Sequence, residues 1–191
     1  MLDTPTRAAV LPRLRGGFGR DYVFVESCAS TQRLLAPGAP EGAVAVADEQ
    51  TEGRGRLGRR WQAPAGTSVL LSVQLRPAAA PQRYPELTVL GAEAAAAAIR
   101  ALTELEPTLK EPNDVLIGGR KVAGVLGEAG EGRVVLGIGI NANVAPEELP
   151  AEVRIPATSL LAETGRRVDR RLLVAELLAE LERRYDAWLT A

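Results

Sequence analysis

The stretch TLKEPNDVLIGGRKVAGVLGE, residues 108–128, holds two apolar segments joined by Gly118-Gly119. A glycine pair between apolar segments is typical of a tight β-hairpin, whose strands run antiparallel. Further strand-like segments follow one another without regular alternation with helices, at 22–27, 43–50, 67–77 and 133–144. Because a parallel sheet requires such alternation, the chain is predicted to be α+β, with a mixed, largely antiparallel sheet.

Three segments are predicted to be helical and to back this sheet. STQRLLAP (30–37) has capping residues at its start and Pro37 at its end. Residues 84–105 form a longer, alanine-rich segment, and residues 168–191 form an amphipathic one. The apolar side of the last helix is predicted to consist of Val168, Leu172, Leu177, Leu181, Tyr185 and Trp188.

Length and charge suggest one domain over residues 21–191, preceded by a flexible segment over residues 1–20. The chain has 191 residues, 46% of them hydrophobic, and a net charge of -1. A nucleic-acid-binding domain is usually basic, so no nucleic-acid partner is expected. One cysteine and the lack of an apolar leader or membrane span favour the cytoplasm. The absence of histidine excludes histidine metal sites and Ser-His triads.

The segment GRGRLGRRW (53–61) matches the pattern G-x-G-x-x-G of dinucleotide-binding turns. Such a turn requires a helix that begins within the motif, whereas Pro64 and Gly66 follow here. A dinucleotide-binding turn is therefore not predicted. Arginine binds phosphate oxygens bidentately, so the segment is either a phosphate-binding loop or a solvated turn.

Two further motifs carry polar residues at strand positions. KEPND (110–114) places a lysine, an asparagine and an aspartate around a proline. By the period of two, Lys121 shares a face with Ala123 and Val125, while Gly124 points the other way. Lys121 is therefore either a guard of a sheet edge or a charge in a cleft. A glycine within a strand, as at Gly124, suggests close approach by a ligand or another backbone.

The order of these motifs resembles the biotin protein ligase family. The matching motifs are S-T at 30–31, E-Q-x-x-G-R-G-R-x-G-R-x-W at 49–61, K-x-P-N-D at 110–114, K-x-A-G-x-L-x-E at 121–128 and G-I-G-I-N at 137–141. The resemblance runs from about residue 22 into the final helix. It implies a catalytic domain related to class II aminoacyl-tRNA synthetases, with a mixed sheet backed by helices.

The resemblance implies a two-step reaction that uses ATP and Mg²⁺. The carboxylate of biotin attacks the α-phosphate of ATP, which gives biotinyl-5′-adenylate and pyrophosphate. A lysine of the biotin carrier domain of acetyl-CoA carboxylase, or of a similar carboxylase, then takes the biotinyl group. Mg²⁺ arrives with ATP and has no fixed protein ligands, and the family allows a homodimer.

The resemblance also assigns residues by position. The implied biotin contacts are Ser30, Thr31, Gln32, Gln50, Gly53, Arg54, Gly55, Arg56, Lys121 and Gly124. The implied contacts to ATP or the adenylate are Arg54, Arg56, Arg59, Trp61, Lys110, Asn113, Lys121 and Asn141. Close-packed backbone around the ligand is implied at Gly137 and Gly139. Lys121, Arg54 and Arg56 would neutralise charge on the reacting phosphoryl group, and Asp114 would orient or deprotonate the acceptor amine.

The chain departs from the family pattern at several points. Glu111 stands where tryptophan is usual, and Gln32 where asparagine is usual. The expected domain lacks the C-terminal β-barrel and the N-terminal helix-turn-helix of many relatives, so operator binding is not expected. Two alternatives stay open, a lipoate–protein ligase-like acyltransferase and a non-catalytic protein that binds biotin or an adenylate.

Overall fold

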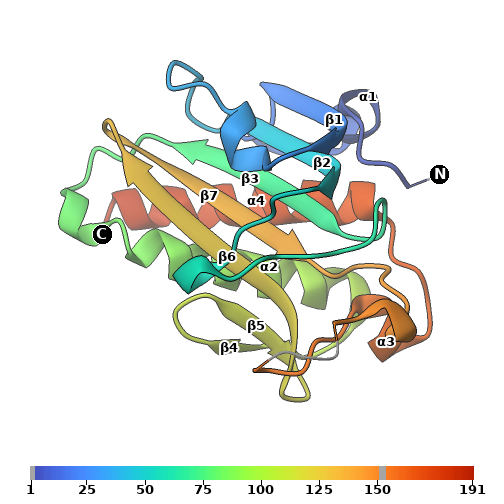
Figure 1. Ribbon diagram of the computed structural model, residues 1–191. Helices are drawn as coiled ribbons and strands as arrows, with labels where there is room; N and C mark the ends of the chain where they lie inside the picture. The colour runs from blue at the N-terminus through green and yellow to red at the C-terminus, as the bar shows by residue number, and fades with distance from the viewer. Residues whose placement is uncertain (1–2, 151–153) are drawn as a thin grey trace.

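The computed structural model describes residues 3–150 and 154–191, which fold around one seven-stranded sheet with the order β1-β2-β3-β7-β6-β5-β4 (Figure 1). The strands are β1 (Tyr22–Cys28), β2 (Val44–Gln50), β3 (Val69–Leu75), β4 (Thr108–Lys110), β5 (Asp114–Ile117), β6 (Arg120–Gly130) and β7 (Arg133–Ile140). Strands β1 and β2 pair in parallel, and the remaining described pairs are antiparallel. The predicted α+β fold with a mixed, largely antiparallel sheet is confirmed.

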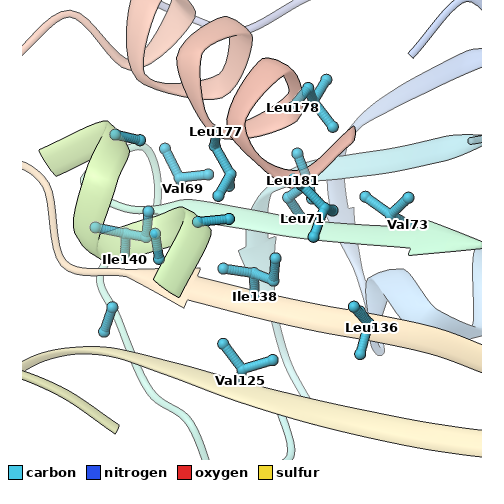
Figure 2. Packing of buried hydrophobic residues seen from close by; sticks show 14 of the residues in the cluster. Val69, Leu71, Val73, Val125, Leu136, Ile138, Ile140, Leu177, Leu178 and Leu181 are labelled. Atoms are coloured by element: carbon cyan, nitrogen blue, oxygen red, sulfur yellow. The ribbon is translucent and has the colours of Figure 1, made fainter. Parts of the chain in front are cut away.

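Two long helices, α2 (Glu86–Thr103) and α4 (Arg170–Leu189), cover one face of the sheet (Figure 1). Every second residue of β3 faces α4, and every second residue of β7 faces α2, as the period of a strand requires. Figure 2 shows this packing for Val69, Leu71, Val73, Leu136, Ile138, Ile140, Leu177, Leu178 and Leu181. Small residues bring α2 close to the sheet, since a Cβ atom at Gly91 would lie 3.1 Å from Val125 Cγ1.

The other helical elements are short. They are α1 (Arg7–Val10), η1 (Leu11–Arg13), η2 (Thr31–Leu34), η3 (Arg56–Gly58), η4 (Pro81–Arg83), η5 (Pro146–Glu148) and α3 (Leu160–Thr164). The helix predicted over 30–37 is thus only a 3₁₀ turn, η2, which packs on β2, β3 and β7. No described helix combines the length and the apolar character needed to cross a membrane.

The N-terminal segment differs from the flexible one that its composition suggests. Val10 is fully buried and Phe18 is nearly so. Tyr22 Oη donates to Pro5 O at 2.7 Å, and the carboxylate of Glu182 accepts from the backbone N–H groups of residues 17 and 18. The few apolar residues of this segment are enough to pack it against β1 and α4, while residues 1–2 lie outside the described part.

The buried side of α4 differs from the prediction at its first turn. Leu172 was expected in the core, but its exposed fraction is 43%, and Leu173 is buried instead. Arg170 is fully buried and forms ion pairs with Asp48, at 2.6 Å, and with Asp3, at 3.3 Å. These ion pairs fix which side of the first turn of α4 is buried. The spacing of apolar residues alone does not reveal them, so the prediction failed at this turn.

Candidate active site

A cleft of about 410 Å³ opens on the face of the sheet opposite α2 and α4. Gly124, Gly137 and Gly139 line it, and their strand neighbours Val125 and Ile138, which also border it, belong to the helix-covered core. The rest of its wall comes from η2, the end of β2, the Gly/Arg segment (residues 53–61), the start of β5 and the region after β7. The lining includes Ser30, Thr31, Gln32, Gln50, Arg54, Gly55, Arg56, Arg59, Arg60, Trp61, Gln62, Asn113, Asp114, Lys121, Leu126, Asn141, Pro150, Arg154, Ile155 and Ala157.

The floor of the cleft is bare backbone covered by one aromatic ring. Gly124 and Gly139 lie opposite each other on β6 and β7. A Cβ atom at Gly124 would be 3.1 Å from Trp61 Cζ3, and one at Gly139 would be 2.6 Å from Trp61 Cε2. Glycine is therefore required at both positions, because the ring packs directly on the backbone of the sheet.

A buried polar network fixes the wall formed by η2. Gln50 Oε1 accepts from Thr31 N at 2.7 Å and from Thr31 Oγ1 at 3.0 Å, and Thr31 Oγ1 lies 2.7 Å from Ser72 Oγ. Gln32 Nε2 donates to Leu126 O at 3.3 Å. These bonds hold the side chains in fixed positions, so this wall is preformed.

The Gly/Arg segment forms a hairpin that projects over the cleft. Trp61 N donates to Gly53 O at 2.9 Å, and Gly55 N donates to Arg59 O at 2.7 Å. A Cβ atom at Gly53 would lie 2.4 Å from Trp61 O, so glycine lets the two arms approach. Leu57 at the tip is 85% exposed and has a φ of 60°. The hairpin does not lead into a helix, which agrees with the rejection of a dinucleotide-binding turn.

Positive charge surrounds this floor. Among the described residues that line the cleft, the cations are Arg54, Arg56, Arg59, Arg60, Lys121 and Arg154, and Asp114 is the carboxylate. Arg54 pairs with Glu128 outside the lining at 2.7 Å, and Arg56 Nη1 donates to Asn113 Oδ1 at 3.1 Å. An excess of guanidinium groups around an apolar floor suits a ligand that carries both a ring and a phosphate.

Lys121 faces the cleft because of a β-bulge in β6. Residue 121 pairs with Leu116 and residue 123 pairs with Val115, so Val122 is an extra residue in β6. The period of two predicted that Lys121 shares a face with Ala123 and Val125, and this prediction is wrong. The extra residue turns Lys121 to the side of Gly124, whose Cβ position is 3.0 Å from Lys121 Cε.

Lys121 and Asp114 form the charged pair of the floor. Lys121 Nζ lies 2.6 Å from Asp114 Oδ1 and 5.6 Å from the centroid of the Trp61 ring. The side chains of the two residues are 24% and 11% exposed. An ammonium group in this position can contact an anion that lies on the floor, and the adjacent carboxylate can orient an incoming amine.

Three predicted contacts lie differently from the others. Lys110 is exposed on β4 and does not line the cleft. Gly53 also lies outside the lining and acts within the hairpin. Asn141 lines the cleft, but its Nδ2 donates to Thr158 O at 2.9 Å, so its amide N–H binds backbone. Glu111 is exposed between β4 and β5.

One wall of the cleft, formed by residues after β7, is not marked by the sequence motifs. Pro150, Arg154, Ile155 and Ala157 line this side. Ser159 caps helix α3 by accepting from Ala162 N at 3.0 Å, and Gly165 ends the helix with a φ of 68°. A capping serine five residues before a threonine–glycine pair is a helix signal that could have identified this region.

Comparisons with known proteins agree with this geometry. The family described as the Biotin/lipoate A/B protein ligase family matches residues 24–144. The chain is 39% identical over 181 residues to the bifunctional ligase/repressor BirA of Bacillus subtilis, which covers 90% of this chain and 56% of that protein. It is 40% identical over 177 residues to a biotin–[acetyl-CoA-carboxylase] ligase of Mycobacterium tuberculosis, which covers 88% of this chain and 65% of that protein.

A solved structure shows the same fold with ligands. The biotin protein ligase from Aquifex aeolicus in complex with biotin and ATP matches with a TM-score of 0.79 and 34% identity. The match covers 88% of this chain and 72% of that one. The chain spans only 56% and 65% of the length of the two curated relatives above. On the family match and the shared fold, the chain belongs to the biotin/lipoate A/B protein ligase family.

Proposed function

We propose that this protein joins biotin to ATP as biotinyl-5′-adenylate and transfers the biotinyl group to a lysine of a carrier domain. The observation that carries the proposal is the cleft, in which a floor of Gly124, Gly139 and Trp61 adjoins a rim of arginines. Lys121 lies where floor and rim meet. The relatives named as biotin ligases and the neighbour in complex with biotin and ATP support this choice of ligands.

In the first step, a carboxylate oxygen of biotin attacks the α-phosphorus of ATP. A new P–O bond forms, the bond to the leaving oxygen breaks, and pyrophosphate departs. Both reactants are anions, so the step needs cations near the phosphoryl oxygens. Arg54, Arg56 and Lys121 line the cleft and supply them. In this proposal, Mg²⁺ enters as a complex with ATP.

In the second step, the neutral amine of the acceptor lysine attacks the carbonyl carbon of the adenylate. The carbon–oxygen bond to phosphate breaks, AMP leaves, and the amine nitrogen loses a proton. Asp114 is the described carboxylate in the cleft wall, so it is the residue proposed to orient or deprotonate the amine. Its contact with Lys121, at 2.6 Å, supports this role, since Lys121 is the cation proposed to contact the reacting phosphate.

Exchange of labelled pyrophosphate into ATP tests the first step directly. Exchange that requires both biotin and Mg²⁺ is expected, because the first step is reversible. The absence of exchange at saturating biotin and ATP would exclude the ligase, and calorimetric binding of biotin without exchange would then indicate a non-catalytic binding protein. Exchange with lipoate in place of biotin would favour the lipoate ligase.

The second step has its own readout. Transfer of labelled biotin to the carrier domain of acetyl-CoA carboxylase, or of a similar carboxylase, is the expected result. Exchange without transfer to any such domain would leave adenylate formation intact and remove this acceptor class. The proposal places the reaction in the cytoplasm and requires no nucleic acid.

A further inference from the structure

The backbone of Lys121 is held by a segment outside its own sheet. Residues 154–158, here called the strap, run alongside β6 at the bulge. Lys121 N donates to Pro156 O at 2.7 Å, and Thr158 N donates to Lys121 O at 2.9 Å. Residue 121 and Ala157 form an isolated parallel bridge. The strap therefore supplies backbone hydrogen bonds at the point where the bulge disrupts the regular ladder.

The strap is itself fastened at its far end. Asn141 Nδ2 donates to Thr158 O at 2.9 Å, and the Thr158 hydroxyl donates to Glu163 Oε1. Glu163 Oε2 accepts from Arg120 Nη2 at 2.8 Å. The two oxygens of the Glu163 carboxylate therefore bind Arg120, which precedes Lys121, and Thr158, whose N–H group donates to the carbonyl oxygen of Lys121.

Glu163 does not itself line the cleft. It belongs to α3, its side chain is 11% exposed, and it is not among the residues of the cleft wall. Helix α3 is fixed by Ser159, which is fully buried and donates to Val144 O at 2.6 Å. Glu163 is thus anchored by the fold and joins Arg120, next to Lys121, to the strap.

We infer that Glu163 is a positioning residue that sets the orientation of Lys121 through Arg120 and the strap. The inference rests on the proposed function for the role of Lys121, whereas the contacts of Glu163 with Arg120 and the strap are independent of it. Removing the carboxylate takes this partner from the Thr158 hydroxyl and from Arg120 together, so the bulge can relax and move the ammonium group away from the reacting phosphate. A displacement of about 1 Å at a reacting centre lowers rates strongly.

Single-turnover formation of the adenylate tests this role. Glu163→Ala should slow it on the order of tenfold, and Glu163→Gln should slow it less, because the amide oxygen still accepts from Thr158. In a Lys121→Ala background, Glu163→Ala should change the rate by less than about twofold, since coupled residues are not additive. A full tenfold effect in that background would overturn the inference. Glu106→Ala, which breaks the exposed pair with Arg100, is the matched control.

A second readout does not depend on activity. Lysine occurs at two positions only, 110 and 121, so methylation with ¹³C-formaldehyde labels two side chains and the N-terminal amine. Glu163→Ala should move the methyl signal of Lys121 and leave that of the exposed Lys110 in place. An unchanged Lys121 signal overturns the inference. A shifted signal in a protein without pyrophosphate exchange would retain the positioning role and reject the proposed reaction.

Discussion

The ring of Trp61 lies so close to Gly139 that a Cβ atom on Gly139 would be 2.6 Å from Trp61 Cε2. The contact joins the Gly/Arg hairpin to β7, so the floor of the cleft and the base of the hairpin share one surface. Gly139→Ala must push the Trp61 ring away from the sheet, because the paired backbone of β7 cannot move and the ring is rigid. We expect biotin affinity to fall about tenfold, from the 1–3 kcal/mol typical of overpacking.

Titration calorimetry with biotin measures this loss, and fluorescence reports the ring, since Trp61 and Trp188 are the two tryptophans. Gly130→Ala is the matched control, because a Cβ atom there would have no neighbour within 4 Å. Equal biotin affinity in the Gly139→Ala and wild-type proteins would show that the ring does not form part of the ligand site.

The two lysines make a direct comparison possible. Lys121 lines the cleft beside Asp114, whereas Lys110 is exposed on β4. Lys121→Ala should slow adenylate formation about 100-fold or more, as loss of a preorganised charge does. Lys110→Ala should stay within about twofold of the wild-type rate, because an exposed charge outside the cleft does not act on the reacting phosphate. Quenched-flow measurement of adenylate formation compares the two, and equal effects would contradict this assignment of the cleft.

The strands and long helices were predictable because the pattern of apolar residues within each segment reflects which of its side chains are buried. Segments 22–27, 43–50 and 67–77 appear as β1, β2 and β3 with shifts of one or two residues at their ends. The alanine-rich segment became α2 because small residues let a helix approach a sheet. The parallel pairing of β1 with β2 was not specified by these local patterns, since it depends on a connection whose η2 turn packs on β2, β3 and β7.

The details of the site were less predictable, since they depend on contacts between distant residues. The family motifs identified most of the residues that line the cleft. They did not identify the face of Lys121, because the bulge in β6 reverses the alternation that a regular strand would have. The strap is irregular backbone, and its bonds to residue 121 span more than thirty positions of the sequence. Arg170 is buried only because Asp3 and Asp48 meet it there.

The ion pair between Arg54 and Glu128 competes with any anion for the guanidinium group. The pair is 2.7 Å long, and its side chains are 42% and 40% exposed. Pairs this exposed contribute about 0.2–1 kcal/mol. Glu128→Gln should therefore tighten binding of ATP by about 1.4-fold to fivefold at low salt. Arg54→Ala should weaken ATP binding, and should remove the benefit of Glu128→Gln in the double variant.

Filter binding with labelled ATP at low and at physiological salt separates these effects, because salt screens exposed charges. A Glu128→Gln protein that binds ATP no better than the wild type at low salt would argue that Arg54 does not face the nucleotide. The same comparison with Arg33 and Glu52, an exposed pair outside the cleft, gives the background effect of removing a carboxylate.

The C-terminal end of α4 carries a pH-sensitive contact with α2. Glu86 Oε2 accepts from Trp188 Nε1 at 2.6 Å and from Arg83 Nη2 at 3.2 Å. The hydrogen bond from Trp188, followed by that from Arg83, lowers the pKa of Glu86 below its ordinary value of 4.5. A carboxylate whose pKa is lower in the folded state stabilises the fold above its unfolded pKa, and that stabilisation disappears as the pH falls through the folded pKa.

Glu86→Gln should therefore lower the melting temperature at pH 7, and the difference from the wild type should narrow below about pH 4.5. Thermal unfolding by circular dichroism between pH 3 and pH 7 measures this difference, with Glu147→Gln on the exposed η5 turn as control. A difference that stays constant across the range would mean that the charge of Glu86 does not contribute to holding α4 on α2.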